Sequence, residues 1–229
     1  MRKSVLIFWS LFFLSEGFAQ SSNELIQQVK QKLEKVNDYT AIGKLRTTVV
    51  FIKAPISNIK VFFKKPDQFK IKKNGGISIS PKGGIKVNLN SILNQKDFVI
   101  VESGNAMIQK TNTKILKLIP TTESSDVVLT TLYIDEVNKL VLKANTTTKE
   151  NGTYEMEMFY RNYANYALPD KVIFSFNTKD YKLPKGFTME FDSGEKATEK
   201  DIIKNKKGKV EILYSSYSIN KGIADAEFL

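Results

Sequence analysis

From Gly43 onward, apolar and polar residues alternate with a period of two, and this pattern limits the fold more than any other feature. Leu45, Val49 and Phe51 would share one side of an extended chain, with Arg46 and Thr48 on the other. Side chains of a β-strand point alternately to its two faces, so the pattern predicts strands. Similar segments follow at hairpin distance with no helix between most of them, which predicts an antiparallel sheet.

Proline, glycine and asparagine separate the predicted strands. Pro55 ends the first strand, because proline cannot donate to a strand ladder. Asn151-Gly152 is typical of a tight hairpin turn. The predicted strands cover residues 45–52, 59–64, 69–72, 77–79, 85–89, 98–102, 115–119, 127–134, 140–144, 153–160, 172–177, 187–191 and 210–217.

One amphipathic helix is predicted before the strands, over residues 21–37. Ser21 and Glu24 have the spacing of a capping box, which satisfies free N–H groups at a helix start. Its apolar face carries Leu25, Val29, Leu33 and Val36. A single helix before many strands is expected to cover a sheet, and further short helices are predicted over residues 90–95 and 198–205.

Several predicted strands are apolar on both faces, which is unusual for a simple two-layer protein. The segments are residues 49–52, 98–101, 115–119 and 127–129. A sheet covered by a helix on one face and lining a cavity on the other gives this pattern. A two-layer sandwich with a central strand gives it too, and periodicity does not separate the two.

The N-terminus has the three parts of a cleaved export signal. Arg2 and Lys3 are followed by an apolar run over residues 4–14, and small Gly17 and Ala19 precede the expected cleavage point. A run this short does not span a bilayer as a helix, which needs about 20 residues. We therefore expect a signal peptide over residues 1–19, a single domain over residues 20–229, and a periplasmic location.

Composition argues against catalysis and against nucleic acid. The chain has no histidine and no cysteine, which removes the commonest base, metal ligand and nucleophile pairs. The formal net charge is +11, yet Arg2, Arg46 and Arg161 are the only arginines. Arginine is the side chain favoured for phosphate and base recognition. We expect no enzyme activity, no cofactor, no metal site and no nucleic-acid partner.

Four short motifs in a fixed order resemble the LolA-like family of periplasmic lipoprotein carriers and lipid-binding proteins. Residues 61–71 read Val-Phe-Phe-Lys-Lys-Pro-Asp-Gln-Phe-Lys-Ile, close to the family's Lys-Arg-Pro-x-x-Phe. Leu-Tyr-Ile-Asp at 132–135, Leu-Pro-Asp-Lys-Val at 168–172 and Pro-Lys-Gly at 184–186 follow. The resemblance covers most of residues 23–191.

The resemblance implies a mainly β fold: a curved antiparallel sheet forming an incomplete β-barrel around a hydrophobic cavity, with an N-terminal helix and short lid helices. It implies a carrier that takes an acylated lipoprotein or lipid from an inner-membrane ABC transporter to an outer-membrane acceptor. Where the carrier proper has arginine before the motif proline, this chain has Lys65. Lysine keeps the charge but loses the planar fork of donors. An alternative function is an envelope sensor of the same fold that acts through protein contacts.

The candidate lipid-binding residues follow from strand alternation and from the resemblance. Met156 and Met158 are expected to share a face, and flexible thioethers suit an acyl-chain pocket. Lys65 is expected at the rim of the lining face, where its ammonium would meet a lipid's polar end; a surface position beside the bend is the alternative. The full set is Val49, Phe51, Val61, Phe63, Lys65, Phe69, Tyr133, Tyr154, Met156, Met158 and Tyr160. An ordinary core would explain its apolar members equally.

Overall fold

A computed structural model describes residues 21–49, 52–53, 56–73, 78–79, 89, 93, 98–149, 152–177 and 207–228. Helix α1 covers Ser22–Leu33, and two short 3₁₀ helices, η1 and η2, cover Ala164–Tyr166 and Asp225–Glu227. The first six strands are β1 Asp38–Val49, β2 Ile52–Lys53, β3 Ser57–Lys64, β4 Gln68–Lys73, β5 Ser78–Ile79 and β6 Phe98–Ile108. The other six are β7 Thr111–Pro120, β8 Val127–Asp135, β9 Leu140–Thr148, β10 Gly152–Phe159, β11 Lys171–Asn177 and β12 Lys207–Ile219.

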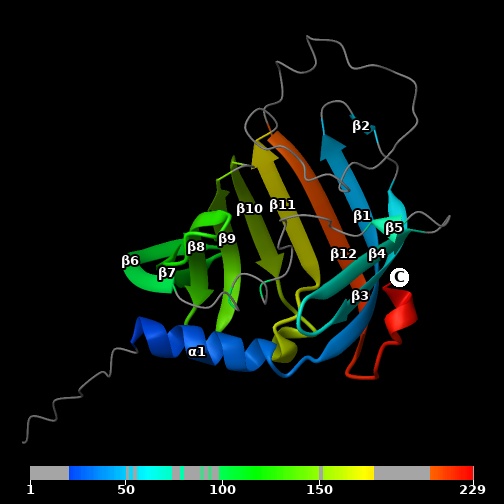
Figure 1. Ribbon diagram of the computed structural model, residues 1–229, viewed down its shortest axis with the longest axis horizontal. Coiled ribbons are helices and arrows are strands. Elements are labelled where there is room, and N and C mark those ends of the chain that lie inside the picture. The colour runs from blue at the N-terminus through cyan, green and yellow to red at the C-terminus, as the bar shows by residue number, and fades with distance from the viewer. Residues whose placement is uncertain are drawn as a thin grey trace, which may run out of the picture.

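All twelve strands belong to one sheet, in the order β5-β4-β3-β1-β12-β11-β10-β9-β8-β7-β6, with the short β2 paired to β1. Each printed register between neighbours along this order is antiparallel, as the hairpin spacing predicted. The sheet curves strongly (Figure 1), and within the described residues β5 and β6 stay at its two edges without pairing. The expected mainly β, incomplete barrel is therefore confirmed.

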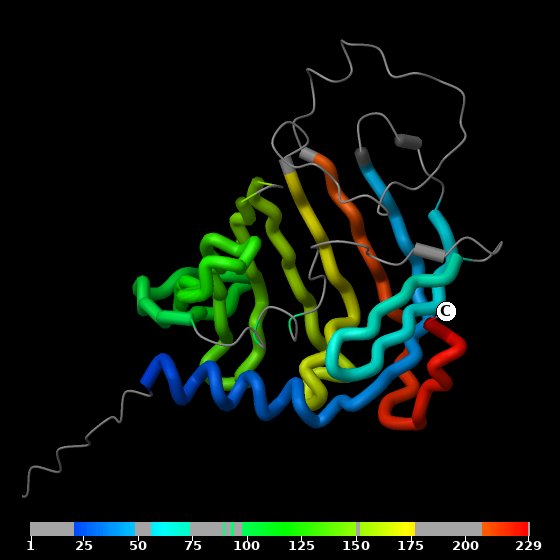
Figure 2. The backbone as a smooth tube through the Cα atoms, viewed as in Figure 1, coloured from blue at the N-terminus to red at the C-terminus, as the bar shows by residue number. Residues whose placement is uncertain are grey.

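Helix α1 lies across one end of the curved sheet, beneath β8 and β9 and extending to η1 (Figures 1 and 2). The Ser21 side chain accepts a hydrogen bond from Glu24 N at 3.1 Å, which is one of the two bonds of the predicted capping box. The helix ends at Leu33, four residues before the predicted end. The backbone N–H of Asn37 instead donates to the Asn220 side chain at 2.7 Å, which fixes the turn into β1.

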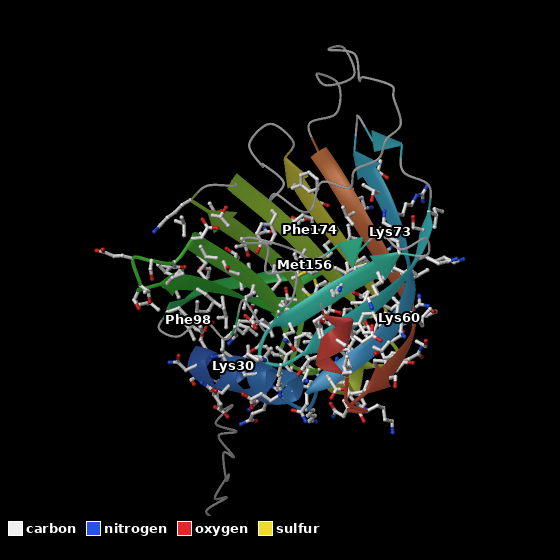
Figure 3. The ribbon with its side chains drawn as sticks, turned by 45° about the vertical axis from the view of Figure 1, so that its right-hand side comes forward. Lys30, Lys60, Lys73, Phe98, Met156 and Phe174 are labelled. Atoms are coloured by element: carbon white, nitrogen blue, oxygen red, sulfur yellow. The ribbon has the colours of Figure 1, made fainter. Side chains whose placement is uncertain are left out.

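Two apolar clusters fill the inside of the curve. One lies between α1 and β7–β10 and contains residues such as Leu25, Leu116 and Leu132, all fully buried. The other lies between β1, β3, β11 and β12 and contains Val61 and Phe174. Met156 and Phe174 lie inside the curve in Figure 3. Burial of this apolar surface, worth about 25 cal/mol per Å², is the main force that keeps the sheet curved around its core.

The segment after β12 folds back over the outside of β3 and β4. There η2 and the following Phe228 cover Phe62, which is 2% exposed although it points away from the cavity. The ion pairs to η2 are Lys64–Asp225 at 2.6 Å and Lys72–Glu227 at 2.5 Å. This contact explains why a phenylalanine is stable on the outer face.

Some predicted elements fall outside the described residues: the signal peptide at 1–19, the strand at 187–191, the helix at 198–205, and most of the strand at 85–89 and the helix at 90–95. Leu89 and Leu93, from this last strand and helix, are described, and both are buried in the cluster between α1 and β7–β10. Strand β12 is longer than predicted, running from Lys207 to Ile219. None of the described helices is long and apolar enough to cross a membrane.

Candidate functional site

An apolar pocket lies on the inner face of the sheet, where the two clusters meet. The end of α1 supplies Leu33, and the segment just after it supplies Val36. The sheet supplies Met156 and Met158 from β10 and aromatic rings from β1, β3, β4 and β12, while η1 and the loop after it, residues 166–169, form another wall. All these walls are apolar or aromatic, so the pocket suits a hydrocarbon ligand.

The enclosed space of the pocket is small. It measures about 660 Å³ when the space open to solvent is counted, and about 60 Å³ within the lining itself. The larger figure lies in the range of ligand pockets, whereas the smaller one holds only a few water molecules. The space enclosed by the lining is therefore small, and an acyl chain would need the walls to move apart.

Four tyrosines, Tyr39, Tyr163, Tyr214 and Tyr217, form a cluster at one side of the pocket, and we call them the tyrosine cluster. The ring of Tyr217 lies at the centre, 4.8–5.3 Å from the other three centroids. Its hydroxyl donates to the Pro169 carbonyl at 2.7 Å, which ties β12 to the loop after η1. The cluster therefore joins β1, β12 and the loop around one aromatic centre.

Burial disfavours the charged form of three of these tyrosines. It raises the pKa of Tyr39, Tyr214 and Tyr217 above the ordinary value of a phenol, and the neighbouring phenols raise the pKa of Tyr217 further. The hydroxyls of Tyr39 and Tyr214 have no hydrogen-bond partner among the residues the structure describes. Both therefore remain neutral donors facing an apolar pocket at physiological pH.

Four of the predicted lipid-binding residues line this pocket: Phe63, Phe69, Met156 and Met158. Val61 and Tyr154 are buried in the same interior, at 0% and 2% exposure, but lie behind the lining. Strand alternation identified the correct face for all six. It did not determine which of them reach the open space.

Two predicted residues lie elsewhere. Tyr133 sits between Leu132 and Ile134, both fully buried, so its own side chain is on the outer face, under the ammonium of Lys143 at 5.7 Å. Its placement in the lining is corrected, because one step along a strand reverses the face. Tyr160 packs against the cluster between α1 and β7–β10 and donates to the Val141 carbonyl at 3.0 Å. Its hydroxyl lies 3.5 Å from the Met158 sulfur, yet Tyr160 is not part of the pocket lining.

The remaining predicted residues are Val49, Phe51 and Lys65. Val49 ends β1, and the placement of its side chain, like all of Phe51, lies outside the described residues. Lys65 lies in the turn after β3, and its ammonium donates to the Glu34 carbonyl at 2.8 Å and to the Asn37 side chain at 3.2 Å. A cation at the C-terminal end of a helix is stabilised by the free carbonyls there. In this structure Lys65 joins the sheet to α1 and does not line the pocket.

The loop wall was not predicted. Residues 163–167 carry no period of two or of 3.6, and residues 168–169 belong to a motif of the family resemblance to which no role in the pocket was assigned. Ala167 has a left-handed φ of 50° there, which ends η1 and turns the chain along the pocket. No group of metal-ligating side chains is assembled in the described part of the chain.

No family model matches the sequence, and no curated protein matches it significantly. The fold itself is LolA-like. A LolA superfamily protein from Nitrosomonas europaea superposes with a TM-score of 0.51 at 14% identity, over 89% of this chain and 97% of that one. A domain named for outer membrane lipoprotein sorting, from Vibrio parahaemolyticus, gives 0.54 at 12% identity, over 90% and 94%. A DUF1329 family protein from Desulfovibrio piger gives 0.52 at 10% identity, over 90% and 95%. Identities this low establish the fold alone.

Proposed function

We propose that this protein binds the acyl chains of a lipid or lipoprotein in the apolar pocket and carries them through the periplasm toward the outer membrane. The observation that supports this most directly is the lining: two methionines, several aromatic rings and the apolar end of α1 around one space. The LolA-like fold, which includes a domain named for lipoprotein sorting, supports it further. The pocket acts as a binding site, without a chemical step.

Binding requires the pocket to widen. An acyl chain gains about 0.8 kcal/mol of binding free energy for each buried methylene, so burying several methylenes offsets the free-energy cost of a moderate rearrangement of the walls. The walls most able to move are the end of α1 and the loop after η1, because they lie outside the hydrogen-bonded sheet. Methionine adapts to this movement, since its thioether chain takes many shapes at small cost.

The polar end of the ligand would meet the tyrosine cluster. The Tyr39 and Tyr214 hydroxyls have no partner among the described residues and can donate to an ester or amide carbonyl. A net hydrogen bond is worth about 0.5–1.5 kcal/mol, which is about a twofold to tenfold effect on affinity. The ligand class that fits is therefore an acyl chain ending in a carbonyl group.

Native mass spectrometry of protein purified from a bacterial envelope tests the proposal. Co-purified lipid, and displacement of an apolar fluorescent dye by a fatty acid, are expected. Tyr214→Phe is expected to weaken fatty-acid binding by about fivefold while leaving the thermal midpoint unchanged, since it removes one donor and no ring. If the folded protein neither carries lipid nor binds the dye, the carrier proposal fails, and a sensor that acts through protein contacts becomes the better reading of the same fold.

The partners follow from this role. A carrier needs a donor at the inner membrane and an acceptor at the outer membrane, and we propose an ABC transporter and an outer-membrane receptor for these positions. Export by residues 1–19 would place the protein between them. Sequencing the N-terminus of the exported protein tests the location, with Gln20 or Ser21 as the expected first residue.

A further inference from the structure

The outer face of the sheet carries a second hollow, a groove of about 1130 Å³ that shares Tyr214 with the lining of the lipid pocket. Its floor crosses β3, β1, β12 and β11, and Gln109, from the turn between β6 and β7, borders it. Its walls differ in kind from those of the pocket, since they carry basic, amide and apolar groups together. We propose that this groove, which we call the outer groove, binds an acidic segment of a partner polypeptide.

Strand register places the groups of the outer groove in adjacent rows. Lys44 is paired with Leu213, and Leu213 with Lys171, so an apolar side chain lies between two lysines. In the next row Ile42 is paired with Lys60. Directly opposed residues lie about 5 Å apart, so each row forms a continuous strip. Figure 3 shows Lys60 toward the outside of the sheet.

A β-bulge helps to shape the floor. The register between β1 and β12 shifts between Ile42 and Gly43, and a bulge locally bends and twists a sheet. A side chain at Gly43 would lie 2.6 Å from the Leu213 carbonyl oxygen, so glycine allows the two strands to approach closely here. The groove is therefore built into the backbone of the strands.

Positive charge dominates the outer groove. Asp170 is the acidic residue among its lining, and its carboxylate already accepts hydrogen bonds from the Arg161 backbone N–H at 2.7 Å and from Asn162 at 3.1 Å. Lys171 faces Glu211 at 3.6 Å. Lys44 and Arg161 are exposed and make no ion pair within the described residues. An acidic ligand would therefore meet the positive charges of Lys44 and Arg161, which no ion pair within the described residues neutralises.

The apolar and amide groups favour a polypeptide over a bare anion or a membrane surface. Ile42 and Leu213 are 45% and 49% exposed, and a concave floor brings them into contact only with a ligand that enters the groove. Asn58 and Asn162 can bond to a peptide backbone. A flat anionic bilayer would contact the basic rim and leave this floor in water.

The test uses the whole exported chain and a short fluorescent peptide of glutamate and leucine. The double variant Lys44→Glu/Arg161→Glu is expected to lose about tenfold in affinity for it and to gain affinity for the same peptide with lysine in place of glutamate. The matched control is Lys35→Glu, an exposed lysine after α1, which is expected to change little.

Binding measurements with other anionic ligands decide which class of ligand the outer groove takes. If vesicles of phosphatidylcholine and phosphatidylglycerol, or inorganic phosphate, show the same affinity and the same loss, the groove is a general anion surface and the proposal is wrong. Equal loss in Lys35→Glu, or absence of peptide binding, overturns it as well. Should the double reversal fail to fold, Lys44→Gln/Arg161→Gln gives the same decision with a smaller loss. Lipid occupancy should be unchanged in all variants, which keeps this result independent of the carrier proposal.

Discussion

Shortening Met158 to alanine offers a direct test of the lipid pocket. Met158 is 2% exposed and forms part of the lining. The substitution removes the γ-methylene, the sulfur and the ε-methyl group. Buried methionine-to-alanine changes cost about 2–5 kcal/mol, and we expect about 2–3 kcal/mol because the new void joins an existing space. For a domain of this size, the thermal midpoint should fall by about 5–10 °C.

A fatty acid should restore part of this loss. If the chain extends into the vacated space, it gains up to about 2 kcal/mol, or about thirtyfold in affinity. A ligand that binds only the folded state raises the midpoint in proportion to the logarithm of its concentration over Kd. Saturating fatty acid should therefore raise the midpoint of Met158→Ala by more than it raises that of the unaltered protein.

Leu132→Ala is the matched control. Leu132 is 0% exposed and belongs to the cluster between α1 and β7–β10, yet it does not line the pocket. Its truncation should destabilise by a similar amount, about 3 kcal/mol, without improving fatty-acid binding. Differential scanning fluorimetry with and without ligand measures both effects. Equal ligand-induced shifts in the unaltered protein and both variants would refute the assignment of Met158 to the ligand pocket.

Three further predictions concern the sheet and its junctions. Lys65→Met should lower the free energy of unfolding by about 1 kcal/mol and leave lipid occupancy unchanged, since its ammonium bonds to the Glu34 carbonyl; loss of lipid in native mass spectrometry would instead restore the rim role predicted from sequence. Gly43→Ala should cost about 2–3 kcal/mol, because its Cβ would meet a backbone oxygen of β12. A urea titration in which Gly43→Ala costs less than about 1 kcal/mol would contradict this. The contribution of Tyr39 and Tyr214 to stability should be constant below about pH 10 and fall above it, because their raised pKa keeps them protonated when folded while unfolded phenols ionise; urea unfolding between about pH 9 and pH 11 measures it, and a flat profile there would argue against burial of these two tyrosines.

The sequence determined the elements and their order. Alternation along β1, β3 and β10 identified the inner face, because the period of a strand is two and each strand buries one side. Ser21 and Glu24 marked the helix start correctly, since a cap depends on residues three positions apart. Phe63, Phe69, Met156 and Met158 were placed in the lining by this local information.

Only the tertiary structure decided the rest, because it depends on contacts between residues far apart in the chain. Tyr133 lies on the outer face since its neighbours Leu132 and Ile134 occupy the inner one. Lys65 reaches the end of α1, 31 residues earlier, which no local pattern encodes. The pairing of β1 with β12 brings the first and the last strand of the chain side by side, and with it forms the tyrosine cluster and the floor of the outer groove. Periodicity predicts which face of a strand a side chain occupies. The residues opposite that side chain, which make it part of a site, are fixed only when the sheet curves around its core.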